Sequence, residues 1–363
     1  MCTTRRSAWF VLLALLLSST FLPAAAPPSP PLPPTWTLDL HEQAVGHLAD
    51  GKGKDTLIAA DGSGAVRFWN LAKGEEIRSF QAHEKGQGLD ALAVSPDGNY
   101  LATGDSRQQI RVWEMDRPKM VHDFDHGLHS GSYSLVFQAD GKRLFAAPTS
   151  QEGVSDVVVY DLVKGKLERR HQWPNRGVWS TMYDRGDGSL ILGGHDQQDE
   201  CEWMIMDAKT GKITRRTALP KVDMSALALS PNKRTLLTAD NSEEAIINLW
   251  DSRTGKRQRT VETGLREIFT VAFSPDGRYV VATCPGVTKP PGIASVKVWD
   301  TKTWKPVWSH RVKEGHRPTI AHFTRDGKWL AVGLSILSGN SGAVLVWDWK
   351  RLRRSFAINP VDD

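Results

Sequence analysis

The sequence predicts an all-β protein assembled from seven copies of one four-stranded antiparallel unit. An apolar segment that ends in an aromatic residue and a small polar residue recurs along the chain, and a tight-turn motif precedes each copy. The residue before the closing polar residue marks each copy. Successive marked positions are 44 to 49 residues apart, a period typical of repeated structural units that pack side by side. These positions, aromatic in every unit but the fourth, are Trp69, Trp113, Tyr160, Met206, Trp250, Trp299 and Trp347.

The first two strands of each unit are predicted from the turn that joins them. Ser95-Pro96-Asp97-Gly98 and Ser274-Pro275-Asp276-Gly277 lie between apolar runs. Asp-Gly in this setting favours a hairpin, because glycine supplies the positive φ that the turn requires. Reduced forms of the turn are Asp50-Gly51, Asp140-Gly141, Asp187-Gly188 and Asp326-Gly327, and Ser230-Pro231-Asn232-Lys233 lacks the glycine.

The third strand is the aromatic-ended segment, and the fourth follows a second turn. Lys73-Gly74 and Thr254-Gly255 are examples of that second turn. The first three strands are mostly apolar, which suits buried strands, whereas the fourth carries charges such as Arg78 and Glu168. Charged side chains are typical of an outer edge strand, so each unit reads as a four-stranded sheet with a solvated edge.

These repeated strands and turns resemble the WD-repeat β-propeller family, in which an aromatic-Asp pair closes the third of four strands in each blade. The resemblance covers roughly Trp36 to Asn359. It implies a seven-bladed β-propeller of four-stranded antiparallel blades, a closed ring that leaves no free sheet edge.

The family often links a His, a Ser or Thr, the Trp and an Asp by hydrogen bonds within one blade. Only the second and third units have a His at the matching distance, namely His83 and His126. In the second unit the resemblance implies a cluster of His83, Thr103, Trp113 and Asp105, although this Asp is offset from its usual place. The other blades are expected to rely on apolar packing.

Two segments compete for the outer strand of the last blade. Trp36–Leu40 can supply it from the amino-terminal side, and Arg354–Ile358 from the carboxy-terminal side. The basic run of Lys350, Arg351, Arg353 and Arg354 is expected to be a turn that leads into that second segment.

The amino terminus has the pattern of an export signal. Arg5 and Arg6 precede the apolar stretch Ala8–Leu17, and Pro23-Ala24-Ala25-Ala26 offers small residues for a peptidase. We therefore expect residues 1–26 to be a signal peptide or signal anchor, 27–34 a proline-rich linker and 35–363 the propeller. The expected location is periplasmic, cell-envelope or extracellular, with a membrane tether if the signal stays uncleaved.

Composition limits the partners. The chain has 46 basic and 41 acidic residues, a formal net charge of +5, and the basic residues are spread along the sequence. Without a basic block that follows a phosphate backbone, no nucleic-acid partner is expected. Cys201 and Cys284 fall in units that are not neighbours, so no disulfide is expected between them.

No constellation for catalysis stands out. The sequence has no G-x-S-x-G nucleophile motif and no glycine loop that opens a helix, and no cofactor is expected. The histidines between His122 and His129 read as strand and loop residues rather than metal ligands. The first strands are apolar or small, with only His47 and His322 as imidazoles on the channel side of the predicted ring.

The sequence therefore predicts a non-enzymatic scaffold that binds a protein or peptide through its loops. Candidate contacts are Arg176, Trp179, Arg266 and Arg317, which lie near strand entries and combine charge with aromatic surface. The alternative is a propeller hydrolase or lactonase, or a small-ligand binder, with a metal at the central channel. That alternative requires several inward carboxylates or histidines from different blades.

Overall fold

The computed structural model describes residues 32–40, 43–107, 109–125, 132–148, 154–174, 177–178, 182–195, 200–219, 224–242, 244–286, 293–337 and 341–356. The expected signal or anchor at 1–26 and most of the expected linker at 27–34 lie outside these residues, so their predicted boundaries stay predictions.

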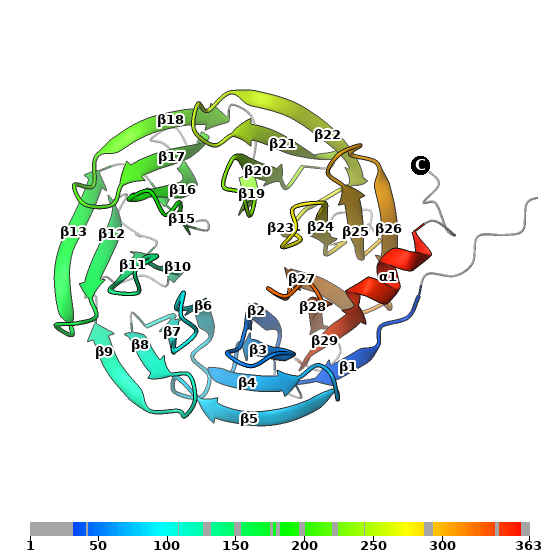
Figure 1. The fold of residues 1–363 in the computed structure, drawn as a ribbon, viewed down its shortest axis with the longest axis horizontal. Helices are drawn as coiled ribbons and strands as arrows, with labels where there is room; N and C mark the ends of the chain where they lie inside the picture. Colours follow the sequence, from blue (N-terminus) through cyan, green and yellow to red (C-terminus); the bar gives the residue numbers. More distant parts are fainter. Residues whose placement is uncertain are drawn as a thin grey trace, which may run out of the picture.

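Seven antiparallel sheets are arranged as blades around a central channel, and the predicted fold class is confirmed (Figure 1). Blade 1 contains β2 (Val45–Asp50), β3 (Thr56–Asp61), β4 (Ala65–Asn70) and β5 (Glu75–Gln81). Blade 2 contains β6 (Leu89–Val94), β7 (Tyr100–Asp105), β8 (Gln109–Glu114) and β9 (Met120–Asp125). Blade 3 contains β10 (Ser132–Phe137), β11 (Arg143–Pro148), β12 (Val154–Asp161) and β13 (Lys166–Pro174).

The inner strand of blade 4 is divided in two, and both pieces pair with the same neighbour. Blade 4 contains β14 (Gly177–Val178), β15 (Tyr183–Asp184), β16 (Ser189–His195), β17 (Cys201–Asp207) and β18 (Ile213–Leu219). Blade 5 contains β19 (Met224–Leu229), β20 (Thr235–Asp240), β21 (Ala245–Asp251) and β22 (Arg257–Leu265). Blade 6 contains β23 (Thr270–Phe273), β24 (Tyr279–Cys284), β25 (Ser295–Asp300) and β26 (Pro306–Arg311). Blade 7 contains β27 (His316–Phe323), β28 (Trp329–Ile336), β29 (Ser341–Asp348) and β1 (Trp36–Asp39).

The apolar core lies between neighbouring blades. Leu237 and Ile247 of blade 5 pack in one cluster with Val271 and Trp299 of blade 6. The marked tryptophan of blade 7, Trp347, lies edge-on to Trp308 of blade 6 with ring centroids 5.3 Å apart. Each blade therefore buries its apolar faces against two neighbours, whereas the outer strands β5 and β22 remain mostly exposed, as their charges predicted.

The amino-terminal strand closes the ring. β1 pairs with β29 from Trp36 opposite Val346 to Asp39 opposite Ala343, and so becomes the outer strand of blade 7. Leu38 is buried against the seam between blades 7 and 1, and the Trp36 indole donates a hydrogen bond to the carbonyl of Leu71 in blade 1 (2.7 Å). Of the two closures that the sequence allowed, the structure selects the amino-terminal one.

The carboxy-terminal expectation was wrong. The basic run is not a turn that leads into a strand but the helix α1 (Trp349–Ser355), whose first turn is capped by Asp348 accepting from the backbone N–H of Arg351 (2.9 Å). Trp349 and Leu352 are buried because three-residue spacing places them on one helix face, and Trp349 packs edge-on to Phe323. With β1 already paired to β29, this segment had no strand position to fill.

The predicted cluster in blade 2 is confirmed. The Trp113 indole donates to the Thr103 hydroxyl (3.0 Å), which contacts His83 Nε2 (2.8 Å), and His83 Nδ1 contacts Asp105 (2.9 Å). Burial by itself raises the pKa of the Asp105 carboxyl, but hydrogen bonds from His83 and from the backbone of Gln109 outweigh it and lower that pKa. Four buried polar groups thus satisfy one another.

The cysteine prediction is also confirmed. Cys201 begins β17 in blade 4 and Cys284 ends β24 in blade 6, and both are buried free thiols. Desolvation raises the pKa of the Cys284 thiol, which keeps it in the unreactive protonated form.

Candidate interaction face and central channel

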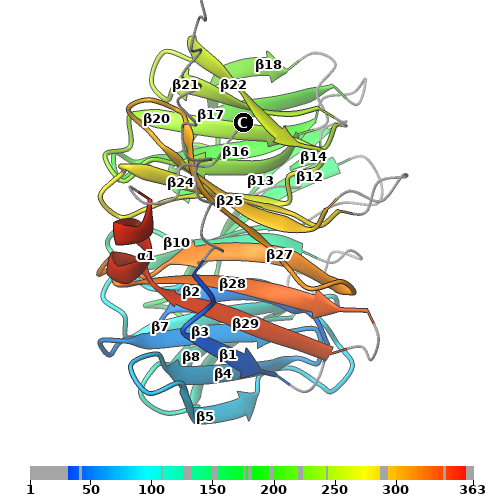
Figure 2. The ribbon, with the colours of Figure 1, turned by 90° about the vertical axis from the view of Figure 1, so that its right-hand side faces the viewer.

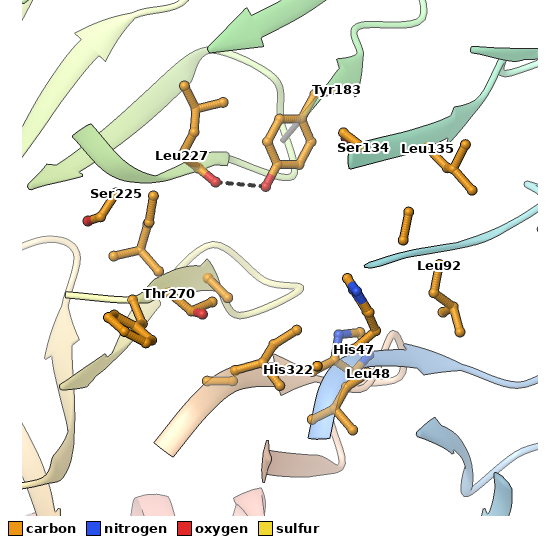
Figure 3. A pocket seen from close by; sticks show the side chains of 18 residues that line it. His47, Leu48, Leu92, Ser134, Leu135, Tyr183, Ser225, Leu227, Thr270 and His322 are labelled. Carbon is orange, nitrogen blue, oxygen red and sulfur yellow. Dashed lines mark hydrogen bonds between the residues drawn. The ribbon is translucent and has the colours of Figure 1, made fainter. Parts of the chain in front are cut away.

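The first strands of the blades line the central channel. Among the described residues their side chains enclose a cavity of about 380 Å³ (Figure 3). All seven blades contribute larger or polar groups, namely His47, Leu92, Ser134, Tyr183, Leu227, Thr270 and His322. Hydroxyl and imidazole groups thus line the channel. Their hydrogen-bond partners show whether they are available to a ligand or hold the blades together.

Hydroxyl groups along the channel bind the backbone of the next blade. The Thr270 hydroxyl donates to the carbonyl of Thr319 (2.8 Å), and the Thr319 hydroxyl donates to the carbonyl of Val45 (2.6 Å), which links blades 6, 7 and 1. The Ser225 hydroxyl likewise donates to the carbonyl of Ile268, from blade 5 toward blade 6. These hydroxyls are therefore engaged in holding the ring together.

Blades 3, 4 and 5 are joined in the same way. The backbone N–H of Met182, just before β15, donates to the Ser134 hydroxyl (2.7 Å). The Tyr183 hydroxyl donates to the carbonyl of Leu227 (2.9 Å), the dashed contact in Figure 3. Desolvation raises the pKa of the Tyr183 phenol, so this group stays protonated and keeps donating.

Bulges in the first strands supply some of these side chains. The register between the first and second strands shifts around Ser225 in blade 5 and around Thr319 in blade 7. A residue in a β-bulge is not paired with the adjacent strand of its own sheet. Its side chain can therefore point in another direction, here toward the next blade. The same shift occurs at Gly46 in blade 1 and at Asp90 in blade 2.

The two predicted channel imidazoles line the cavity, which confirms their placement. His47 makes hydrogen bonds with the backbone of Asp90 and Leu89 in blade 2, and desolvation lowers its pKa to about 4, so the ring is neutral at neutral pH. Burial and the nearby Asp105 carboxylate raise the pKa of Asp90 to about 6. His47 is thus one more link between neighbouring blades.

His322 forms the corresponding link between blades 7 and 1. Its Nε2 lies 3.1 Å from a carboxylate oxygen of Asp50, whose other oxygen accepts from the backbone N–H of Arg325 (2.9 Å). Burial tends to raise the pKa of Asp50, but the contact with His322 and the Arg325 N–H outweigh this and lower it. The seam that closes the ring is therefore held by a half-buried charged group.

Replacement of Asp50 is expected to weaken this seam in a pH-dependent way. Asp50→Asn should lower the free energy of unfolding at pH 7 by about 1–2 kcal/mol, the usual worth of a partly buried hydrogen-bonded charge. A carboxyl with a depressed folded pKa stabilises above its unfolded pKa, near 3.9, and loses that effect as pH falls through the folded value. The difference between the variant and the unaltered chain should therefore shrink between pH 5 and pH 3.

Urea unfolding at pH 7 and at pH 3.5 measures this difference. Asp116→Asn is the matched control, because Asp116 also bridges two blades, through Lys52 at 2.6 Å, but is exposed. This control should change stability little at either pH. An Asp50→Asn deficit that stays constant from pH 7 to pH 3.5 would contradict the role given to the carboxylate.

The four predicted partner contacts are only partly placed. Arg176 and Trp179 lie outside the described residues. Arg266 lies in the loop between β22 and β23, at the entry to blade 6. Arg317 lies near the start of β27, at the entry to blade 7, on the same side of the ring. Both are half-buried. The structure thus brings two of the four to neighbouring positions on one face.

Sequence reasoning missed the inter-blade hydroxyl contacts. Ser225 and Thr270 belong to first strands that read as apolar or small in the sequence, although a Ser or Thr near the start of the first strand is visible there and at Thr319. Their acceptors are carbonyl groups of other blades, and no local pattern identifies those acceptors. Among the described residues, no group of three His, Cys, Asp or Glu side chains is positioned to hold a metal ion.

Comparison with known proteins agrees with this architecture. A family model for the WD domain, G-beta repeat, matches residues 74–114, which span the outer strand of blade 1 and the first three strands of blade 2. The periodic tryptophan protein 2 homolog of Mus musculus is 25% identical over 318 residues, covering 84% of this chain and 32% of that protein. Its Dictyostelium discoideum counterpart is 22% identical over 248 residues, covering 66% of this chain and 24% of that protein.

Eukaryotic translation initiation factor 3 subunit I of Candida albicans is 25% identical over 185 residues, covering 48% of this chain and 51% of that protein. The chain thus spans between about a quarter and a half of the length of these curated relatives.

The relatives contradict the predicted export. Translation begins on ribosomes inside the cell, and one relative is a subunit of a translation initiation factor. The prediction of a periplasmic, cell-envelope or extracellular location is therefore wrong by this comparison. Within the part of the chain that the structure describes, no helix has the length and apolar character needed to cross a membrane.

Proposed function

Because the chain belongs to the WD-repeat β-propeller family, we propose that it is a non-enzymatic scaffold that binds a protein or peptide on the face formed by its inter-blade loops. The observation that carries this proposal is the set of hydrogen bonds that first-strand side chains around the channel make to neighbouring blades. The hydroxyls of Ser225, Thr270, Thr319 and Tyr183 bind the backbone of adjacent blades instead of converging on a reacting group. A rigid ring of this kind acts through the surfaces that it displays.

The proposed contact surface contains Arg266 and Arg317, together with Arg176 and Trp179. Arginine and tryptophan are enriched among residues that dominate interface energies, because they combine a large contact area with directional hydrogen bonds. One ring face can bury the ~800 Å² per partner of a standard interface without any rearrangement of the blades. The naming of one relative as a subunit of an initiation factor supports assembly with other proteins.

Cross-linking of the full chain in a lysate of its host, followed by mass spectrometry, tests the proposal. We expect a recurrent partner whose cross-links fall on the loop face and whose recovery drops at least tenfold in an Arg266→Ala/Arg317→Ala double variant. The matched control is Arg257→Ala/Arg259→Ala, two exposed arginines on the outer strand β22. A stoichiometric bound metal in the purified chain, with no partner recovered, would overturn the scaffold proposal in favour of channel chemistry.

A further inference from the structure

The turns between first and second strands and those between third and fourth strands lie on one side of the propeller. In antiparallel blades both kinds of turn emerge on the same face, and α1 lies there because it follows the third strand of blade 7 (Figure 2). We call this surface the turn face. It comprises residues 51–55, 71–74, 95–99, 115–119, 138–142, 162–165, 185–188, 208–212, 230–234, 252–256, 274–278, 301–305, 324–328 and 349–355.

The turn face is strongly basic. These segments contain 23 Lys and Arg residues and seven Asp residues, a formal charge of +16, whereas the whole chain carries only +5. The described loop residues on the opposite face include four basic and five acidic side chains. The basic residues that look dispersed in the sequence are therefore brought together by the fold.

The charge is unevenly distributed around the ring. Blades 4 to 7 with α1 carry 16 of the basic residues against three acidic ones, and so contribute +13 of the +16. Eight further acidic residues stand directly before these segments at strand ends, namely Asp50, Glu114, Asp161, Asp184, Asp207, Asp251, Asp300 and Asp348. Several of their carboxylates accept hydrogen bonds from turn N–H groups, as Asp207 does from Thr210 (2.7 Å) and Asp251 from Thr254 (2.7 Å). Even with all eight counted, the face keeps a formal charge of +8.

A small cavity opens on this face between blades 3 and 4. Its volume is about 210 Å³, and its lining is mostly apolar, with Phe145, Ala208 and the side-chain stems of Arg143, Arg169 and Lys209. One carboxylate, Glu168, holds both guanidinium groups, at 2.6 Å from Arg143 Nε and in hydrogen-bond contact with Arg169. The result is a pocket with an apolar interior and a cationic rim.

We propose that the turn face binds an acidic segment of a partner protein, and that one apolar side chain of that segment enters the pocket beside Ala208. Carboxylates of the segment would pair with the Lys and Arg side chains of blades 4 to 6, next to the pocket. This surface is separate from the loop face proposed above, so the two proposals can fail independently.

The pocket and the turns favour a polypeptide over other polyanions. Single-stranded nucleic acids bind on exposed aromatic rings, whereas Trp304 and Trp349, the aromatic residues of the turn face, are buried. Peripheral membrane binding uses several apolar side chains that project outward, whereas Val163 is the one strongly exposed large hydrophobic residue within the described turn-face segments. A recess of this size with cations around it suits one apolar side chain flanked by carboxylates.

Fluorescence anisotropy with the full chain and a labelled 16-residue peptide, polyglutamate with one central Leu, tests the proposal at 150 mM NaCl. We expect saturable binding that weakens at least tenfold in an Arg253→Glu/Lys256→Glu variant of the turn face. Arg311→Glu/Lys313→Glu is the matched control, because it makes the same charge change with two exposed residues at the opposite face, and it should alter the Kd less than twofold. Equal weakening by both variants, or no saturable binding, would overturn the proposal.

The pocket is tested with a second peptide in which Gln replaces the Leu. The unaltered chain should bind the Leu peptide at least threefold more tightly, and Ala208→Met, which fills the pocket, should abolish that preference. If Ala208→Met fails to fold by circular dichroism, the two peptides on the unaltered chain still decide the point, since equal affinities would overturn the role of the pocket. Tighter binding of a 16-nucleotide RNA or of phosphatidylserine vesicles than of the Leu peptide would overturn the assignment to a polypeptide.

Discussion

A chain shortened to begin at residue 41 is expected to lose roughly 5 kcal/mol of stability and to aggregate, because the shortening removes β1. Leu38 and Leu40 are fully buried, and each contributes about 2 kcal/mol by the usual worth of a buried leucine. The Trp36 hydrogen bond to Leu71 is lost as well. Without β1, the edge of β29 exposes unpaired backbone groups that can pair with another molecule.

Thermal unfolding by circular dichroism and size-exclusion chromatography measure this effect. A chain that begins at residue 32 is the control and should keep the melting temperature of the full chain, because it retains β1 and the carbonyl of Leu32 that accepts from the Trp347 indole (3.1 Å). A melting temperature within about 2 °C of this control for the chain that begins at 41 would show that the ring does not depend on β1.

His83→Leu is expected to lower the free energy of unfolding by about 3 kcal/mol, since it leaves a buried carboxylate without its main partner. The imidazole joins Thr103 to Asp105, and both partners are buried. Leucine fills a similar volume but offers no hydrogen bond, so Asp105 keeps its desolvation cost and loses the compensating contact.

Blade 5 supplies the comparison for this variant. There the Trp250 indole donates to the Thr238 hydroxyl (3.0 Å), as in blade 2, but among the described residues no histidine or carboxylate extends this pair. Thr238→Val should therefore cost only about 1 kcal/mol, the usual net worth of a single neutral hydrogen bond. Urea unfolding followed by tryptophan fluorescence compares the two variants, and a His83→Leu cost no greater than that of Thr238→Val would contradict the cooperative cluster.

Much of the fold followed from local chemistry. The turn at Ser95–Gly98 and the aromatic-ended strand at Trp113 are each recognisable within a few residues, and their repetition predicted seven blades before any long-range contact was known. The cluster of His83 with Asp105 was predictable because its members lie within one repeat. Features that stay within one unit were thus accessible from the sequence.

Features that join distant units were not accessible. His322 was predicted to face the channel, but its partner Asp50 lies 272 residues away, so its part in the ring seam could not be inferred. The same holds for the choice of β1 over the carboxy-terminal segment, which decided that Trp349–Ser355 would form a helix. The charge of the turn face was hidden because each turn contributes at most two basic residues, and only α1 contributes four.

The pairing of β1 with β29 also determines when the ring can close during synthesis on the ribosome. Blades 1 to 6 each consist of consecutive strands and can form as their residues leave the exit tunnel. Blade 7 cannot, because its outer strand is made first and its other three strands last, with the contact between Thr35 and Asp348 joining residues 313 apart. Loop closure over such a length is slow, so β1 has to wait as an unpaired strand until synthesis is almost complete. The closing step is thus the one at which a nascent chain is most exposed to pairing with a neighbour, and at which a chaperone would protect it most.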